Sequence, residues 1–223
     1  MKVDDFYDNF KYKVCETFKS MQGEGTNTGR MATFIRLSGC NLKCPFCDEP
    51  KHKDASLAKE MQTRELVSIV RTNETFLTII TGGEPTLHNC NPLISQLQKI
   101  GNKVAIETNG LNLSNVHRAD LITWSPKTLN YESFIRSIDA LVSSPSIPSI
   151  ELKIPFLYSD EELLIFVDKV SEILDEHIVA KFITPINDSK TLDMKANKKA
   201  FEFCMKYPEF SFNMQTHKIL GVE

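Results

Sequence analysis

The sequence Gly39-Cys40-Asn41-Leu42-Lys43-Cys44-Pro45-Phe46-Cys47-Asp48 is the stretch from which the rest of the chain is interpreted. Its three cysteines have the spacing Cys-x3-Cys-x2-Cys. Thiolates are the ligands that iron–sulfur clusters and zinc prefer. Neither His52 nor Cys90 stands at a spacing typical of a fourth zinc ligand. A [4Fe–4S] cluster held by three cysteines keeps one iron open, so this loop predicts a reagent-activating cluster. A zinc loop and a chance group of buried cysteines are the simpler alternatives.

Composition restricts the class of protein. The chain has 223 residues, 41% of them hydrophobic, which suits one globular domain. The formal net charge is −3 and the pI near 6.0, so no overall basic field attracts nucleic acid. No apolar run approaches the ~20 residues that span a bilayer. The first five residues, MKVDD, lack the apolar core of a signal peptide. With six cysteines, three of them clustered, we expect a reduced, cytoplasmic protein without membrane or nucleic-acid partners.

Along the chain, short apolar runs rich in β-branched residues alternate with helix-like segments. The expected strands are 12–18, 31–37, 76–81, 103–107, 121–124, 149–154, 178–183 and 210–215. The expected helices are 63–71, 91–101, 131–142, 161–174 and 190–207. This alternation predicts an α/β fold with a mostly parallel sheet. The units are too few for a closed eight-fold barrel, so we expect an open partial (β/α) barrel in a single domain, 1–223.

The cluster loop resembles the signature of radical S-adenosylmethionine enzymes, in which an aromatic residue, here Phe46, precedes the last cysteine. The resemblance implies that Cys40, Cys44 and Cys47 hold a [4Fe–4S] cluster that acts in catalysis. Its open iron would chelate S-adenosylmethionine, an electron from the cluster would cleave the sulfonium to a 5′-deoxyadenosyl radical, and Phe46 would pack near the adenine. Asp48 is expected to contribute to the cofactor site.

Polar motifs follow three of the expected strands: Gly82-Gly83-Glu84-Pro85, Glu107-Thr108-Asn109-Gly110 and Ser125-Pro126-Lys127. The carboxyl ends of parallel strands meet at one edge, so these motifs should join the cluster loop there. Each motif alone could be a turn, a cap or a solvated charge. Together they predict a binding site, and the resemblance to radical S-adenosylmethionine enzymes assigns it to the cofactor. Gly82 and Gly83 would let backbone groups approach the methionyl part, and Glu84 would accept a hydrogen bond from its ammonium. The other expected cofactor-binding residues, for ribose hydroxyls or the carboxylate, are Glu107, Asn109, Ser125, Pro126 and Lys127.

A narrower resemblance is carried by Phe18-x-Ser20-x-Gln22-Gly23-Glu24-Gly25 and by Phe34-x-Arg36-Leu37-x-Gly39 leading into the cysteines. With Thr81 before the glycines and the ending Gln215-Thr216-His217-Lys218, these motifs resemble the 7-carboxy-7-deazaguanine synthase family. The family implies conversion of 6-carboxy-5,6,7,8-tetrahydropterin to 7-carboxy-7-deazaguanine with loss of ammonia, on the path to queuosine and related deazapurines. The radical would take hydrogen from C6 of the pterin.

The same resemblance assigns a substrate site and partners. Arg36 would bind the substrate carboxylate, for which a guanidinium is well shaped. A C-terminal strand and tail, 208–223, would close the pocket. A homodimer, an electron donor such as flavodoxin or ferredoxin, and Mg²⁺ are implied. The expected substrate-binding residues are Met21, Gln22, Gly23, Glu24, Arg36, Thr81 and His217.

The chain departs from the family at Cys47-Asp48-Glu49, where the family has Cys-Asp-Thr and the threonine binds magnesium. Carboxylate oxygens suit Mg²⁺, so Glu49 is the expected replacement ligand. Two rival functions stay open at this point. A glycyl-radical enzyme activase would need a docking surface for a protein substrate and has no use for Gln-Gly-Glu-Gly. A non-catalytic iron–sulfur or zinc protein would need four protein ligands and no cofactor site.

Overall fold

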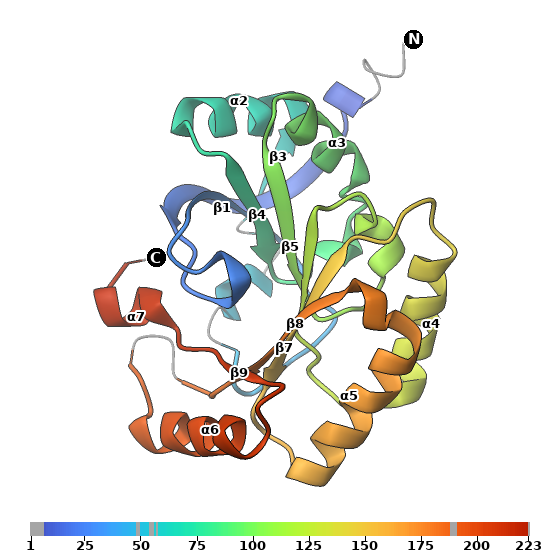
Figure 1. The fold of residues 1–223 in the computed structure, drawn as a ribbon. Coiled ribbons are helices and arrows are strands. Elements are labelled where there is room, and N and C mark those ends of the chain that lie inside the picture. Colours follow the sequence, from blue (N-terminus) through green and yellow to red (C-terminus); the bar gives the residue numbers. More distant parts are fainter. Residues whose placement is uncertain (1–6, 48–49, 54–55, 57, 188–190, 223) are drawn as a thin grey trace.

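The computed structural model describes residues 7–47, 50–53, 56, 58–187 and 191–222 (Figure 1). One sheet of nine strands organises it, in the order β3-β1-β2-β4-β5-β6-β7-β8-β9. The strands are β1 Lys11–Met21, β2 Met31–Leu37, β3 Lys59–Gln62, β4 Leu77–Gly82, β5 Lys103–Thr108, β6 Leu121–Trp124, β7 Ser149–Pro155, β8 Ile178–Thr184 and β9 Ser211–Phe212. The helices are α2 Thr63–Asn73, α3 Asn91–Lys99, α4 Tyr131–Val142, α5 Asp160–Leu174, α6 Met194–Lys206 and α7 Thr216–Leu220.

The sheet is mostly parallel and open. β1 pairs antiparallel with β2 and β3, whereas every pair from β2–β4 to β8–β9 is parallel. Within the described residues β3 and β9 are the two end strands and do not pair with each other. The fold is therefore the α/β partial barrel that the alternation predicts.

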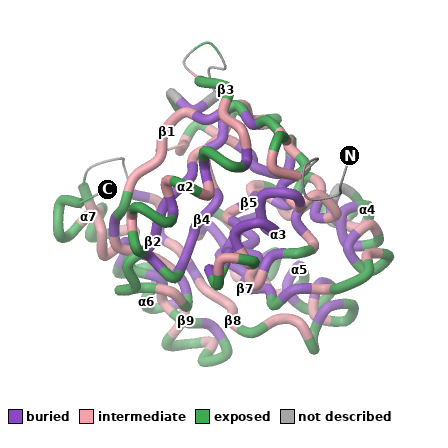
Figure 2. The backbone as a smooth tube through the Cα atoms, turned by 90° about the horizontal axis from the view of Figure 1, so that it is seen from above, coloured by how far each residue is buried: buried purple, intermediate pink, exposed green. Residues whose placement is uncertain are grey.

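The two faces of the sheet have different chemistry because successive strand residues point to opposite faces. Ile122 and Trp124 of β6, and Ile150, Leu152 and Ile154 of β7, belong to the main core with side chains of α2 to α6. Figure 1 shows the larger helices around the outside of the sheet, and Figure 2 shows buried segments concentrated in the strands.

On the inner face a smaller apolar cluster, centred on Phe34, Ile79 and Ala105, fills the amino-terminal half of the strands. Toward the carboxyl ends the inward positions turn polar. There β6 presents Thr123 beside Glu151 of β7. This change from apolar to polar along the inner face creates the lining of the site.

Most predicted elements are confirmed, and β2, β6 and α4 have the predicted bounds. Helix α5 begins with a capping box, in which Ser159 Oγ accepts from Glu162 N and the Glu162 side chain accepts from Ser159 N. Helix α3 begins at Asn91 as predicted and ends at Lys99, two residues before the predicted end. Strand β3 and helix α7 were not predicted, and the predicted strand 210–215 forms only at Ser211–Phe212. No helix in the described ranges is long and apolar enough to cross a membrane.

Candidate active site

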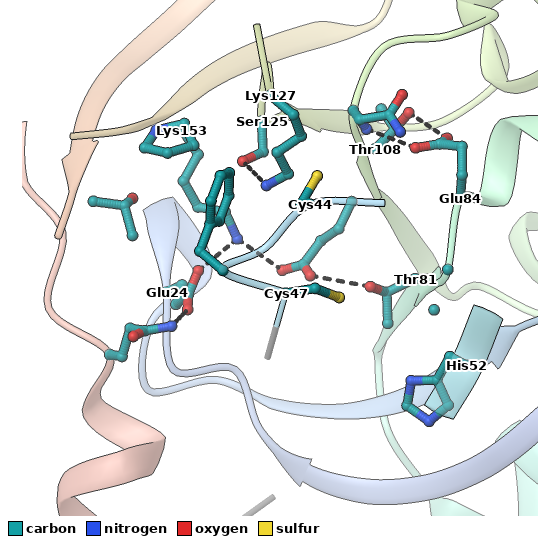
Figure 3. Close-up of a pocket in the computed structure, with 18 of the residues that line it drawn as sticks. Glu24, Cys44, Cys47, His52, Thr81, Glu84, Thr108, Ser125, Lys127 and Lys153 are labelled. Atoms are coloured by element: carbon teal, nitrogen blue, oxygen red, sulfur yellow. Dashed lines mark hydrogen bonds and ion pairs between the residues drawn. The ribbon is translucent and has the colours of Figure 1, made fainter. Parts of the chain in front are cut away.

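A cavity of about 260 Å³ lies where the inner face turns polar. Figure 3 shows its lining side chains converging from strand ends and from the cluster loop. The predicted site residues that line it are Met21, Gln22, Gly23, Glu24, Arg36, Cys40, Cys44, Phe46, Cys47, Thr81, Gly82, Gly83, Glu84, Glu107, Asn109, Ser125, Lys127 and His217. Pro126 is buried and does not line it. Asp48 and Glu49 lie outside the described residues.

The three cysteines are half-buried and all face this cavity. Leu42 N donates to Cys40 Sγ at 3.4 Å, a contact that suits a thiolate. Among the described residues, no three His, Cys, Asp or Glu side chains converge on a point where one metal ion would fit. Three thiolates that line one cavity are the donor set that a [4Fe–4S] cluster with one open iron needs, so the residues present fit that group.

The glycines after β4 permit a close approach of the chain to itself. A Cβ on Gly82 would lie 2.1 Å from Leu37 O, and one on Gly83 would lie 2.0 Å from Gly39 O. Gly83 N donates to Leu37 O at 3.0 Å, and Glu84 N donates to Gly39 O at 2.7 Å. Because Gly82 and Gly83 have no side chains, the end of β4 can lie in contact with the end of β2 and with the cluster loop. That is a physical reason for them beyond the expected approach of a cofactor.

Glu84 is buried and ties two loops together. Its Oε1 accepts from Thr86 N at 2.9 Å and from the hydroxyls of Thr86 and Thr108 at 2.6 Å each. Its Oε2 accepts from Asn109 N at 2.7 Å. Oε2 keeps one further acceptor position. The expected contact with an ammonium stays a prediction, and it would have to use that oxygen.

The neighbouring strand ends add polar groups to the same side. Lys127 Nζ donates to Ser125 Oγ at 2.8 Å (Figure 3). Asn109 Nδ2 donates to Asn41 Oδ1 at 2.9 Å, which links the loop after β5 to the cluster loop. The three predicted polar motifs are thus brought together with the cysteines at one edge of the sheet.

In another part of the cavity wall, the ammonium of Lys153 lies between the carboxylates of Glu24 and Glu107. Lys153 Nζ lies 2.5 Å from Glu24 Oε2 and 3.5 Å from Glu107 Oε1. Burial alone would raise the pKa of Glu24, but the charge and hydrogen bond of Lys153 and the amide of Gln215 lower it to about 2. Burial would lower the pKa of Lys153, but Glu107 and Glu24 raise it well above its ordinary value. Glu24 and Lys153 are therefore both charged at neutral pH.

Arg36 lines the cavity from the adjacent strand. Its Nη1 donates to Glu16 Oε1 at 2.7 Å, and its guanidinium carbon lies 4.8 Å from the centre of the Phe18 ring. The same Glu16 oxygen lies 2.9 Å from His52 Nε2. These contacts orient the guanidinium at the cavity wall, where it is 16% exposed and can meet an anionic group.

The C-terminal tail closes another wall. Thr216 N and Oγ1 donate to Gly23 O at 3.1 and 3.0 Å, and Gln215 Nε2 donates to Glu24 Oε1 at 2.6 Å. A Cβ on Gly23 would lie 2.1 Å from His217 Nδ1, so the glycine makes room for the imidazole. Burial is the main cause of a lowered pKa at His217, which keeps the ring neutral at pH 7.

Sequence reasoning missed Lys153, His52 and Asn187, which also line the cavity. A signal for Lys153 was present. In Ser149–Pro155 the residues Glu151 and Lys153 alternate with isoleucine and leucine, although an interior strand of a parallel sheet is normally apolar on both faces. Charged residues at alternate positions there indicate a polar cavity. For Asn187 we find no local signal, because its place depends on a hydrogen bond to Gln215.

Comparison with known proteins gives a consistent result. The model of the Radical SAM superfamily matches residues 34–134. A 7-carboxy-7-deazaguanine synthase of Bacteroides thetaiotaomicron is 33% identical over 94% of this chain and 98% of that relative. The enzyme of the same name from Haemophilus influenzae is 32% identical over 100% and 98%. One from Hyperthermus butylicus is 44% identical over 46% of this chain and 45% of the relative. In fold, the crystal structure of QueE from Escherichia coli matches with a TM-score of 0.72 and 24% identity, covering 96% of this chain and 98% of that one.

Proposed function

The chain belongs to the 7-carboxy-7-deazaguanine synthase family of radical S-adenosylmethionine enzymes, and from this we propose that it converts 6-carboxy-5,6,7,8-tetrahydropterin to 7-carboxy-7-deazaguanine with loss of ammonia. One observation of the structure supports this most strongly. The loop at 22–25, which distinguishes this family from other radical enzymes, lines the same cavity as the three cysteines and the C-terminal tail. Substrate-specific and cofactor-specific motifs therefore face one space.

The cofactor side comprises the cluster loop and the strand ends next to it. Cys40, Cys44 and Cys47 would hold the [4Fe–4S] cluster. When bound, the cluster and S-adenosylmethionine would supply one-electron chemistry that removes a hydrogen atom from a C–H bond. Asn109 is linked to the cluster loop through Asn41, which supports a place for it at the cofactor. Gly83 and Glu84 keep the loop after β4 in contact with the cluster loop.

The substrate side presents complementary groups to a carboxypterin. Glu24 is ionised, and each of its oxygens accepts one hydrogen bond and keeps room for another from a ring N–H. Arg36 would bind the carboxylate that the pterin carries at C6. Thr81 and the neutral His217 would complete the pocket, the imidazole as donor or acceptor without added charge.

The remaining requirements are also proposals. Mg²⁺ would assist at the substrate carboxylate, with Glu49 in place of the threonine that the family uses. A low-potential carrier such as flavodoxin or ferredoxin would reduce the cluster. The enzyme would act in the cytoplasm as a homodimer, its C-terminal tail closing the pocket of its own chain. The glycyl-radical activase is disfavoured because loop 22–25 lines a cavity of small-molecule size.

Anaerobic turnover tests the proposal. The reconstituted enzyme would receive S-adenosylmethionine, a reductant and 6-carboxytetrahydropterin, with and without Mg²⁺, and products would be identified by mass spectrometry. We expect a deazaguanine carboxylate and one ammonia per product. Glu49→Ala should weaken the response to Mg²⁺ while leaving cluster content unchanged. Formation of 5′-deoxyadenosine without a pterin-derived product would show that the substrate is a different molecule.

A further inference from the structure

Lys153 is a buried lysine to which no step of the proposed reaction assigns a role. It lies on the inner face of β7 and is 8% exposed. Lysine is almost never buried at such a position unless it is paired. Figure 3 shows its side chain extending between strand ends, with dashed lines to the carboxylates on both sides.

The two carboxylates belong to different parts of the site. Glu24 lies in the loop after β1 that we assign to the substrate, whereas Glu107 lies on β5 in the motif that we assign to the cofactor. Each carboxylate also accepts hydrogen bonds from neutral donors. Gln215 donates to Glu24 at 2.6 Å, and Gln22 and Thr81 donate to Glu107 at 2.9 and 3.2 Å. The ammonium is the charged link between the two networks.

A purely structural ion pair does not explain this arrangement well. A buried pair stabilises a fold little better than apolar residues of similar volume would. Here one ammonium serves two cavity-lining carboxylates, with a third, Glu151, nearby in the same strand. Thr26 and Thr123 hold Glu151, donating at 2.7 Å each. The positive charge of Lys153 therefore offsets the repulsion between the two carboxylates that line this small cavity.

We propose that Lys153 is a positioning residue: it ties the substrate-facing Glu24 to the cofactor-facing Glu107 and so fixes the pterin carbon that reacts relative to the cofactor. The inference rests on the proposed function and deepens it. Without the ammonium, the carboxylates repel each other and one of them takes up a proton. The pterin then loses a hydrogen-bond acceptor and its alignment. Cleavage of the cofactor consequently becomes uncoupled from formation of the deazaguanine product.

Three variants of the holoenzyme test this role. Lys153→Met removes the charge at similar length, and Lys153→Arg keeps the charge. Lys103→Met is the matched control, because Lys103 also pairs with a carboxylate, that of Asp120 at 2.7 Å, but is 68% exposed and outside the cavity. The readouts are binding of 6-carboxypterin by fluorescence, thermal unfolding, and the ratio of deazaguanine product to 5′-deoxyadenosine.

Lys153→Met should weaken 6-carboxypterin binding by about 10- to 100-fold, as loss of groups that orient ligand-binding side chains commonly does. Its product-to-deoxyadenosine ratio should fall. Lys153→Arg should recover a large part of the binding affinity and of the product-to-deoxyadenosine ratio. Lys103→Met should match the wild type in both measurements. Should Lys153→Met not fold, the arginine variant decides: a wild-type ratio supports the role of the charge, and an uncoupled ratio despite a normal melting temperature overturns it.

The pH dependence separates positioning from structure. In Lys153→Met the titratable groups left around the position of the ammonium are Glu24, Glu107 of β5 and Glu151 of β7, with His217 of α7 close to Glu24. Pterin binding by this variant should strengthen as the pH rises and the shared proton leaves, whereas the wild type should change much less. Equal 6-carboxypterin binding and equal product-to-deoxyadenosine ratios in wild type and Lys153→Met would overturn the role of Lys153 and leave the proposed function intact. Failure of the wild type to bind 6-carboxypterin would overturn the proposed function and the inference with it.

Discussion

Replacing Glu24 by glutamine should make the protein less stable at neutral pH, and this difference should disappear in acid. The side chain of Glu24 is 11% exposed and accepts hydrogen bonds from Lys153 and Gln215. Its pKa falls from an ordinary 4.5 to about 2 in the folded protein. A difference of that size corresponds to about 3 kcal/mol of folding free energy.

The sign follows from linkage. A carboxyl whose pKa is lower in the folded state favours folding when it is ionised. The stabilisation is complete above pH 4.5 and is lost as the pH falls toward about 2, where the folded protein also takes up the proton. Glutamine at this position cannot ionise, so Glu24→Gln lacks the stabilisation at every pH.

Urea unfolding of wild type and Glu24→Gln at several pH values measures this. The free energy of unfolding of the variant should be lower by up to about 3 kcal/mol at pH 7, with a gap that narrows below about pH 4.5. Glu60→Gln is the control, because Glu60 pairs with Lys11 at 2.6 Å but is 58% exposed and should show almost no gap. A Glu24→Gln gap that is absent at pH 7, or constant down to about pH 3.5, would refute the reasoning.

Three further substitutions have distinct readouts. Gly23→Ala places a Cβ 2.1 Å from His217 Nδ1, so the tail should shift, and 6-carboxypterin titration should show about tenfold weaker binding. The same substitution made in a His217→Ala background should have a smaller effect on binding, because the clash is absent there. Gly83→Ala places a Cβ 2.0 Å from Gly39 O, so iron analysis after reconstitution should find less cluster per chain, with the helices intact by circular dichroism. Glu84→Gln replaces one carboxylate oxygen by an NH2 group that would face the N–H and O–H donors of the protein. The free energy of unfolding in urea should fall by about 1–3 kcal/mol. An unchanged free energy of unfolding would contradict the hydrogen bonds described at Glu84.

The strands and helices were predictable where the pattern of the chain was strong. Residues 31–37 and 121–124 are apolar and β-branched, and both lie inside the sheet with the predicted bounds. Strand β3, Lys59–Gln62, was not predictable from its own composition, because three of its four residues are polar. It forms as an edge strand because its backbone pairs with Lys11 to Val14 of β1.

The predicted strand at 210–215 was too long for a different reason. Residues 210–215 are extended in pattern, but only Ser211–Phe212 pair with β8. Beyond them the side chains of Asn213 and Gln215 bond to loop 22–25, with Asn213 Oδ1 accepting from Gly25 N at 2.9 Å. The start of α6 was placed too early for a simpler reason. Asp193 caps the helix by accepting from Lys195 N and Ala196 N, a signal that was present in the sequence.

For the site, motif positions predicted which residues share the cavity but not how they interact. Glu84 was expected to face the cofactor, and the structure shows four hydrogen bonds to it from the protein itself. Lys153 was missed because no motif includes it. Its role depends on the strand order, which places β7 two strands from β5 and which a single sequence does not reveal.

Transfer of deuterium from C6 of the pterin tests the central claim most directly. The reconstituted enzyme would be incubated anaerobically with C6-deuterated 6-carboxytetrahydropterin, and the nucleoside fraction and the pterin-derived product would be analysed by mass spectrometry. A carboxydeazaguanine product together with deuterium on the 5′ carbon of the cofactor-derived nucleoside is the expected result. Cofactor cleavage from an intact, reduced cluster with no deuterium transfer and no deazaguanine would contradict the assignment of this cavity to carboxypterin chemistry.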